Sequence, residues 1–257
     1  MAHVEPARSS LALQSLGALL ALLALPAPAS AQYRDPDWAQ EWAINGLLLS
    51  GWLVADLFKE DLAPRTCRWC DTEDGRWRPP APDRIARDSL LASSPSAAAT
   101  ASDILAYVVL PGAALGVDAL SREGDWRGAA SDATLISRGV ASALMLNQVV
   151  KFSVGRARPY THVSPEPFAD NPDQNLSFYS GHTSLAFSTV MSTGLVLSRR
   201  DSPYAPWVFG IGLPAAAAVG ALRIAADKHY LTDVVTGAAA GVLMSWVAVC
   251  LLPYSDE

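Results

Sequence analysis

Long apolar segments in succession constrain this chain more than any other feature of its sequence. A first, short segment covers residues 44–58. Five longer ones, rich in Ala, Gly, Val and Leu, follow at 104–120, 135–150, 184–197, 207–222 and 234–252. No run of any length alternates apolar and polar residues, as a half-buried strand would. The sequence therefore predicts an all-α bundle of about five to six apolar helices, whose small residues allow close packing.

Composition limits the partners of the chain. Apolar residues make up 51% of its 257 residues, charged residues make up 17%, and the net charge is −6. The negative balance and the lack of any Lys/Arg-rich run argue against nucleic acid as a partner. The apolar content is high for a soluble protein and low for a fully embedded transporter. We therefore expect a bundle that lies in membrane lipid or closely against it.

The N-terminus is typical of an export signal. Arg8 precedes an apolar run at 11–25, and the small residues at 29–31 form a cleavage site. A helix of the mature fold is the alternative, but Pro26 argues against continuing such a helix. We predict that residues 1–31 are a signal peptide and that the mature chain works in the cell envelope, outside the cytoplasm.

Two regions are expected in the remaining chain: an N-terminal helix and polar loop at 32–102, and a helical core at 103–257. The stretch 59–101 is polar and proline-rich, which predicts an irregular connection. It contains Cys67 and Cys70, spaced as in a redox motif but without a strand-to-helix context. A zinc site would need two further ligands, and no second Cys/His pair lies nearby. A short disulfide is the favoured interpretation.

The first of three polar clusters follows the apolar segment at 135–150. Lys151 and Arg158 lie just beyond it, and Pro159 redirects the chain. Two cations at a helix end can simply complement the helix dipole. The functional interpretation is a clamp for a multiply charged anion.

The second cluster is Ser180, Gly181 and His182, at the start of the segment 184–197. Backbone N–H groups at a helix start form an anion site when a glycine lets the ligand approach, and Ser180 adds a hydroxyl donor. His182 would lie at the rim of the anion, suited to protonating a leaving oxygen. The alternative is a capped helix start with an incidental histidine.

The third cluster is Arg223, His229 and Asp233. If the last two share a helix, the interval of four residues places them on one face. A carboxylate there fixes the tautomer of the imidazole, whose free nitrogen can act as nucleophile or base. Arg223 offers a planar donor fork to an oxyanion. An ordinary polar junction between two helices is the alternative.

Together and in this order, the clusters resemble the signature of the type 2 phosphatidic acid phosphatase and vanadium haloperoxidase superfamily. That signature is Lys, six residues, Arg-Pro; then Pro-Ser-Gly-His; then Ser-Arg, five residues, His, three residues, Asp. The first part is complete here, whereas Tyr179 replaces the proline of the second and Leu222 replaces the serine of the third. Three ordered parts are far more specific than one motif.

The resemblance implies hydrolysis of phosphate monoesters or diphosphates through a phosphohistidine. His229, oriented by Asp233, would attack phosphorus, and His182 would protonate the leaving group. The phosphate-binding residues would be Lys151, Arg158, Ser180, Gly181 and Arg223. No carboxylate cluster suggests Mg²⁺, so we expect a metal-independent enzyme without a cofactor.

A site at the membrane edge favours a lipid phosphate, such as phosphatidic acid or an isoprenyl diphosphate. The alternatives are a soluble periplasmic acid phosphatase of broad specificity, a vanadium-dependent haloperoxidase and a non-catalytic membrane scaffold. The stretch 44–58 is short against the about 20 residues that a crossing needs. If it does not cross, the polar clusters face the periplasm and the turn at 199–200 lies inside, as the positive-inside tendency prefers.

Overall fold

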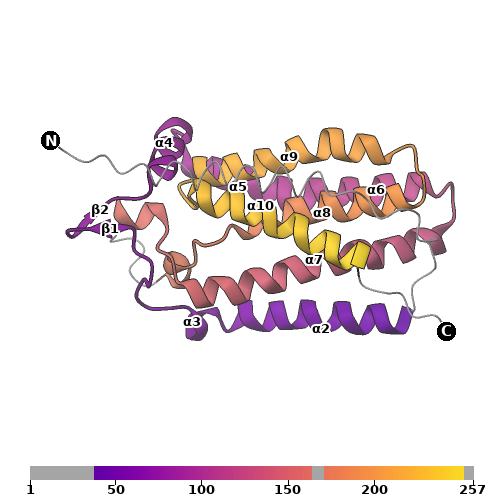
Figure 1. Cartoon of the computed structure of the whole chain (residues 1–257), viewed down its shortest axis with the longest axis horizontal. Coiled ribbons are helices and arrows are strands. Elements are labelled where there is room, and N and C mark those ends of the chain that lie inside the picture. Colours follow the sequence, from indigo (N-terminus) through magenta and orange to yellow (C-terminus); the bar gives the residue numbers. More distant parts are fainter. Residues whose placement is uncertain (1–37, 164–170, 252–257) are drawn as a thin grey trace.

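The protein is a bundle of antiparallel helices with a small hairpin and a short helix at one end (Figure 1). The computed structural model describes residues 38–163 and 171–251. The α-helices are α2 (Trp38–Leu57), α3 (Lys59–Leu62), α4 (Ala81–Leu90), α5 (Pro95–Ile104), α6 (Leu110–Ser121), α7 (Trp126–Val154), α8 (Gly181–Arg199), α9 (Ala205–Ala225) and α10 (Leu231–Trp246). The short elements are η1 (Leu105–Val109), η2 (Pro159–His162), η4 (Pro172–Asn175), η5 (Val247–Leu251), β1 (Thr72–Glu73) and β2 (Arg76–Trp77). The all-α prediction is confirmed.

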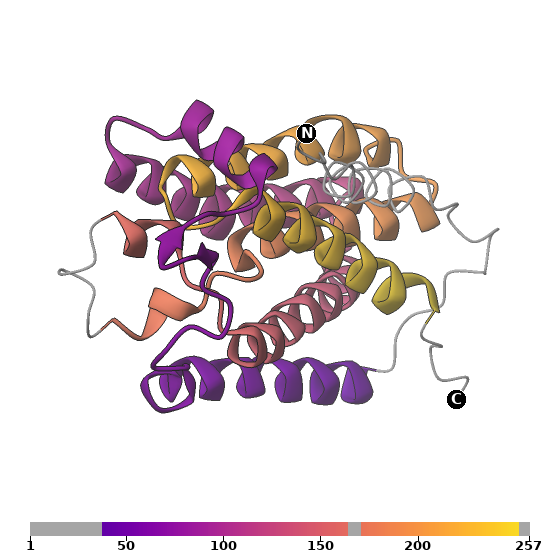
Figure 2. The ribbon, with the colours of Figure 1, turned by 60° about the vertical axis from the view of Figure 1, so that its left-hand side comes forward.

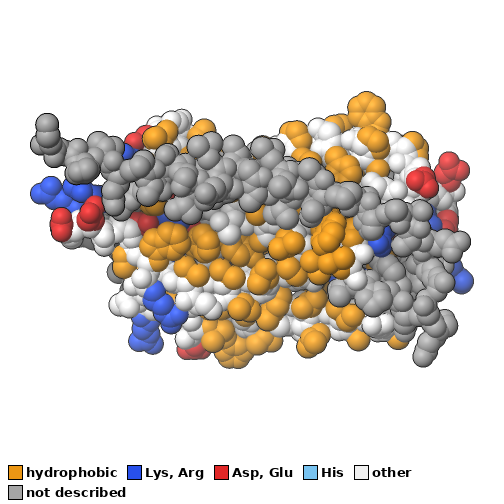
Figure 3. Space-filling view, viewed as in Figure 1, with side chains coloured by type: hydrophobic (Ala, Val, Ile, Leu, Met, Phe, Trp, Pro, Cys, Tyr) orange, Lys and Arg blue, Asp and Glu red, His pale blue; other side chains and the backbone are white. Residues whose placement is uncertain are grey.

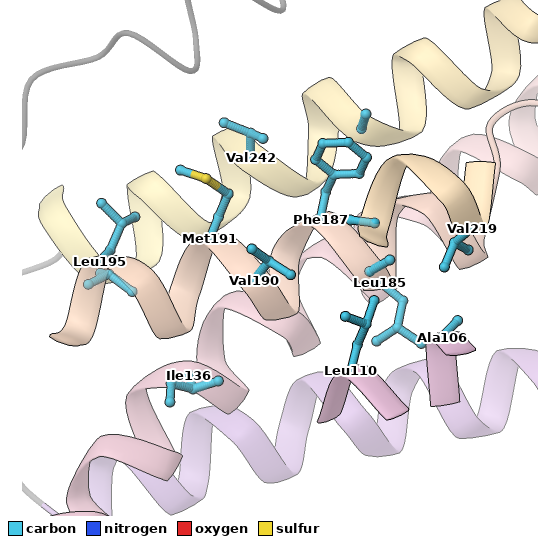
Figure 4. Packing of buried hydrophobic residues seen from close by; sticks show 14 of the residues in the cluster. Ala106, Leu110, Ile136, Leu185, Phe187, Val190, Met191, Leu195, Val219 and Val242 are labelled. Atoms are coloured by element: carbon cyan, nitrogen blue, oxygen red, sulfur yellow. The ribbon is translucent and has the colours of Figure 1, made fainter. Parts of the chain in front are cut away.

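Helix α8 is the centre of the bundle. Every residue from 183 to 197 is buried, and the helix contacts α6, α7, α9 and α10. Its apolar residues form the middle of the core, as Figure 4 shows for Leu185, Phe187, Val190, Met191 and Leu195. The polar residues between them are mostly Ser and Thr, whose hydroxyls can bond to carbonyls of the preceding turn. A helix with so many small polar residues is therefore stable when other helices cover it on all sides.

Helix α7 is longer than the predicted segment 135–150 because its first half carries buried polar residues that pair with other elements. Asp125 caps its N-terminus by accepting from the backbone N–H of Gly128 at 3.1 Å. Further along, the side chain of Arg138 is paired with Glu41 of α2. The helix ends at Gly155, which has a left-handed conformation with φ of 61°.

Within residues 38–163 and 171–251, four helical segments are long and apolar enough to cross a membrane: Pro95–Ser121, Trp126–Val154, Ala205–Ala225 and Leu231–Leu251. Large apolar side chains on them face outward, among them Tyr107, Leu115, Trp207 and Ile211. Figure 3 shows apolar side chains over the middle of one face and most charged side chains towards its ends. An exposed apolar surface of this extent is typical of contact with lipid.

The N-terminal half is more ordered than the sequence predicted. Helix α2 has 20 residues, not the short stretch 44–58. The connection 59–101, predicted to be irregular, instead contains α3, α4, the start of α5 and an antiparallel hairpin that pairs Thr72 with Trp77. The hairpin and α4 lie together at one end of the bundle in Figures 1 and 2.

Two further sequence predictions concern this half. Cys67 and Cys70 form the predicted disulfide. The region boundary expected between residues 102 and 103 falls inside the continuous helical segment formed by α5, η1 and α6. The predicted signal peptide lies outside the described residues.

Candidate active site

Four helix ends meet where the hairpin and α4 lie. Helices α7 to α10 alternate in direction, so the C-terminal ends of α7 and α9 lie beside the N-terminal starts of α8 and α10. Lys151 lies in the last turn of α7, Arg223 lies in the last turn of α9, and Asp233 lies in the first turn of α10. The three polar clusters are therefore at the same end of the bundle.

His229 is buried and has a defined tautomer. Its Nδ1 lies 2.8 Å from the backbone oxygen of Ser177. A carbonyl oxygen can only accept, so Nδ1 carries the proton and Nε2 keeps its lone pair. Nε2 has no hydrogen-bond partner among the described residues. This imidazole can act as a nucleophile through Nε2.

The surroundings of His229 keep it neutral. Burial, followed by the charges of Arg158, Arg223 and Lys151, lowers the pKa of His229 well below its ordinary value. The positive charges of three side chains thus act on the imidazole of His229. A neutral base inside a cationic pocket is the arrangement that an anionic substrate requires.

Asp233 lies beside His229 but does not fix its tautomer directly. Its Oδ2 is 3.6 Å from Nδ1 of His229, and it accepts instead from the Ser177 hydroxyl at 2.5 Å and from the backbone N–H of Tyr230 at 2.9 Å. Its Oδ1 accepts from Arg156 at 2.6 Å. The expected carboxylate–imidazole pair is therefore completed by Ser177, which contacts both partners.

The cations of the site have N–H donors that no group of the described chain uses. Arg223 is 5% exposed, donates to Ser102 at 3.1 Å and to Asp103 at 3.2 Å, and leaves its Nε without a partner among the described residues. Arg158 is also 5% exposed and donates from Nε to the backbone oxygen of Asp173 at 2.8 Å. The side-chain ammonium group of Lys151 makes no hydrogen bond or ion pair within the described part of the chain. A buried donor without a partner is costly unless a ligand satisfies it.

The start of α8 has features of both interpretations of the second cluster, the capped helix start and the anion site. The Ser180 hydroxyl caps the helix, accepting from the backbone N–H of Thr183 at 3.4 Å and from its hydroxyl at 2.9 Å. A Cβ at Gly181 would lie 2.7 Å from Oδ1 of Asn147 and 3.5 Å from Nζ of Lys151. Only glycine therefore allows this backbone to approach the end of α7 so closely.

His182 is held by a residue that the sequence did not single out for the site. Its Nε2 lies 2.7 Å from Oδ1 of Asp103, the same oxygen that accepts from Arg223. The ring of Tyr107 packs edge-on against the imidazole at 4.9 Å between centroids. Burial, and then the charge of Arg223, lowers the pKa of His182. The negative charge of Asp103 and of a bound phosphate favours protonation of this ring.

Sequence reasoning missed Asn147, Arg156 and Ser177 altogether, and considered Asp103 only as a helix start. Asn147 donates to the backbone oxygen of Tyr179 at 2.8 Å and so supports the loop before α8. The side-chain hydrogen-bond partners of these four residues are 32 to 120 positions away. No local spacing signals such contacts. No group of three His, Cys, Asp or Glu side chains suited to a metal is found within the described ranges.

Residues 133–257 match the family described as the PAP2 superfamily. The chain carries a PAP2 superfamily domain. That match confirms the resemblance inferred from the three clusters, all of which fall inside it. The PAP2 domain covers α7 from residue 133 onward and all of α8, α9 and α10.

One curated relative gives a second comparison. Lipid A 1-phosphatase of Porphyromonas gingivalis is 34% identical over 112 residues, which are 43% of this chain and 22% of that protein. The chain thus spans about a fifth of the length of the curated relative it matches. No solved structure matches the chain.

Proposed function

We propose that this protein hydrolyses a phosphate monoester or diphosphate of a membrane lipid through a phosphohistidine on His229. The observation that carries the proposal is a buried, neutral imidazole whose Nε2 keeps its lone pair beside three cations. Phosphoryl transfer needs a positioned nucleophile and fixed positive charge, because its transition state spreads negative charge over the equatorial oxygens. Lys151, Arg158 and Arg223 supply that charge, and the backbone at Gly181 supplies further donors.

The reaction has two steps. Nε2 of His229 attacks phosphorus while the bond to the leaving oxygen breaks, and that oxygen takes a proton from His182. The positive imidazole that forms is stabilised by the Ser177 carbonyl and by Asp233 at 3.6 Å. Water then attacks phosphorus and returns a proton to His182, the P–N bond breaks, and phosphate leaves. No metal or cofactor takes part in this proposal.

An apolar cavity supports a lipid as the substrate. It has a volume of 300 Å³ and lies between η1, α6, α8 and α9. Its lining residues lie on the same helical segments as residues of the site. Leu105 is two residues after Asp103, and Thr189 is seven residues after His182. Ala215 is eight residues before Arg223. With a helical rise of 1.5 Å per residue, the cavity begins roughly 10 Å from the phosphate site along the helices. That spacing suits an acyl or prenyl chain attached to a phosphate in the site.

The membrane setting agrees with this substrate class. Four segments of the described chain are suited to crossing a membrane, and the relative named lipid A 1-phosphatase acts on a lipid phosphate by its name. We further propose that the site end faces the periplasm, because the turn with Arg199 and Arg200 lies at the opposite end of the bundle.

The test is phosphate release by detergent-purified protein in EDTA. The substrates are short-chain phosphatidic acid, an isoprenyl diphosphate and an aryl phosphate, with the His229→Ala variant as control. We expect EDTA-resistant release that prefers the lipids and is lost in the variant. Equal release from lipid and aryl phosphate would contradict the lipid proposal, and no release from any substrate would contradict the phosphatase proposal.

A further inference from the structure

Every side-chain nitrogen of Arg156 donates to a partner in the described structure, and the proposed reaction does not use this cation. Its side chain has no exposed surface. Its Nε donates to Asp71 at 2.8 Å, its Nη2 to Asp83 at 2.9 Å and its Nη1 to Asp233 at 2.6 Å. The rings of Trp69 and Tyr230 lie 4.1 Å and 3.8 Å from its central carbon. Three carboxylates and two aromatic faces leave this guanidinium a single orientation.

The three carboxylates come from two different regions. Asp233 belongs to the site, whereas Asp71 and Asp83 belong to the segment 59–91, outside the residues that match the family. This segment was expected to be only an irregular connection. Its two carboxylates instead meet the site through Arg156, and their side chains are 3% and 0% exposed.

The same segment holds the start of α10. Asp83 accepts from the backbone N–H and from the hydroxyl of Thr232, each at 2.8 Å. Arg87 donates two hydrogen bonds to Asp227, at 2.6 Å and 2.8 Å. The stretch that carries His229 is thus fixed on both sides by residues of α4.

We propose that Arg156 is a positioning residue for His229 and that Asp71 and Asp83, from the segment 59–91, hold it in that role. Asp71 and Asp83 hold Arg156, and Arg156 binds one oxygen of Asp233. The other oxygen of Asp233 then faces Ser177, whose carbonyl accepts the Nδ1 proton of His229. The inference rests on the proposed function, because it assigns a role within that reaction.

If Arg156 positions His229, its loss should change the kinetics in a different way than if its contacts only hold the segment 59–91 on the bundle. A displaced imidazole slows attack on phosphorus but leaves the three cations that bind phosphate in place, so kcat falls while KM changes little. Loose attachment of the segment would instead lower stability, whichever contact is removed. Two groups of variants separate these roles.

Asp83→Asn and Arg156→Lys interrupt the chain of contacts that ends at His229. Lysine keeps the charge of Arg156 but cannot reach three carboxylates with fixed geometry. Trp77→Phe removes another contact of the segment, the 3.2 Å hydrogen bond to the Tyr230 hydroxyl, and leaves Arg156 intact. Arg78→Gln removes an exposed ion pair with Glu73 in the same segment and is the matched surface control.

The experiment measures kcat, KM and the thermal unfolding midpoint of full-length protein in detergent, on the best substrate of the wild type. We expect Asp83→Asn and Arg156→Lys to lower kcat by about 10- to 100-fold with KM changed by less than about twofold. Trp77→Phe and Arg78→Gln should keep nearly the wild-type kcat. The activity of the wild type is measured first. A wild type that releases no phosphate contradicts the proposed function, whereas the variants of an active wild type test only the positioning role.

Three outcomes would overturn the inference. One is a folded Asp83→Asn variant with the kcat of the wild type. Another is a Trp77→Phe variant that loses as much kcat as Asp83→Asn at the same stability. If Asp83→Asn and Arg156→Lys do not fold, Asp71→Asn takes their place, because Asp71 pairs with Arg156 but, unlike Asp83, does not also hold Thr232 at the start of α10. A folded Asp71→Asn variant with unchanged kcat would then overturn it.

Discussion

The two histidines of the site have different partners, and the partners suggest different chemistry. His229 donates from Nδ1 to a backbone carbonyl and keeps the lone pair of Nε2, which is the attacking atom in the proposed reaction. His182 shares Nε2 with Asp103, a carboxylate that favours the protonated ring. The proposed nucleophile and the proposed acid are thus distinguished by what each imidazole contacts, although the pKa of each is lowered by the charges of the same cations.

The acid role of His182 is tested by the leaving group. His182→Ala should slow hydrolysis of alkyl phosphates by about 100-fold or more, a usual contribution of general acid catalysis. Aryl phosphates should lose much less, because their leaving oxygen needs little protonation. Steady-state kinetics with one alkyl and one aryl phosphate measure the difference. Equal losses on both substrates would count against His182 as the acid.

The pH dependence follows from His229. Its attack requires the neutral ring, and burial together with the cations lowers the pKa of His229 below the ordinary 6.5. As the pH falls, kcat/KM should therefore hold through pH 6.5 and decline only below it. Arg158→Gln removes one of the cations that lower this pKa, so the acid limb should move upward in that variant. A wild-type acid limb above pH 6.5 would contradict the assignment.

At the scale of elements, the sequence predicted the long helices but not what fixes their ends. Apolar content identified α8, α9 and α10 nearly in full. It missed the first nine residues of α7 and the first six of α2, where polar side chains occur. The polar side chains among those residues have partners elsewhere: Glu41 of α2 pairs with Arg138, 97 residues away, and Asp132 of α7 accepts two hydrogen bonds from Arg122. Hydropathy does not reveal such contacts.

The apolar cavity is lined by η1, α6, α8 and α9, and its proposed role in binding the lipid chain can be tested separately. Ala215→Phe should fill part of the space between α8 and α9 and raise KM for long-chain lipid phosphates while leaving aryl phosphate hydrolysis nearly unchanged. Ala217 lies on the exposed side of the same helix, so Ala217→Phe is the matched control. Kinetics with substrates of increasing chain length measure the effect. If both variants affect lipid and aryl phosphate alike, the cavity does not hold the substrate chain.

At the scale of the molecule, the three clusters and the bundle were predictable, and the supporting residues were not. The signature residues lie at fixed spacings near helix ends, so an up-and-down bundle brings them together. Arg156 and Asp83 are 73 residues apart, and Asp103 and Arg223 are 120 apart. Such pairings depend on how the segment 59–91 and α5 pack on the domain, which no spacing within the sequence specifies.

The central claim is a phosphohistidine on His229, and the most direct measurement is to trap it. Purified protein is mixed with a substrate labelled in its phosphate, quenched with alkali within milliseconds, digested and analysed by mass spectrometry. The account predicts an acid-labile phosphoryl group on the peptide that contains His229, formed before phosphate is released and absent from His229→Gln. Phosphate release by an active wild type with no phosphorylated peptide, or with phosphate on another residue, would contradict it.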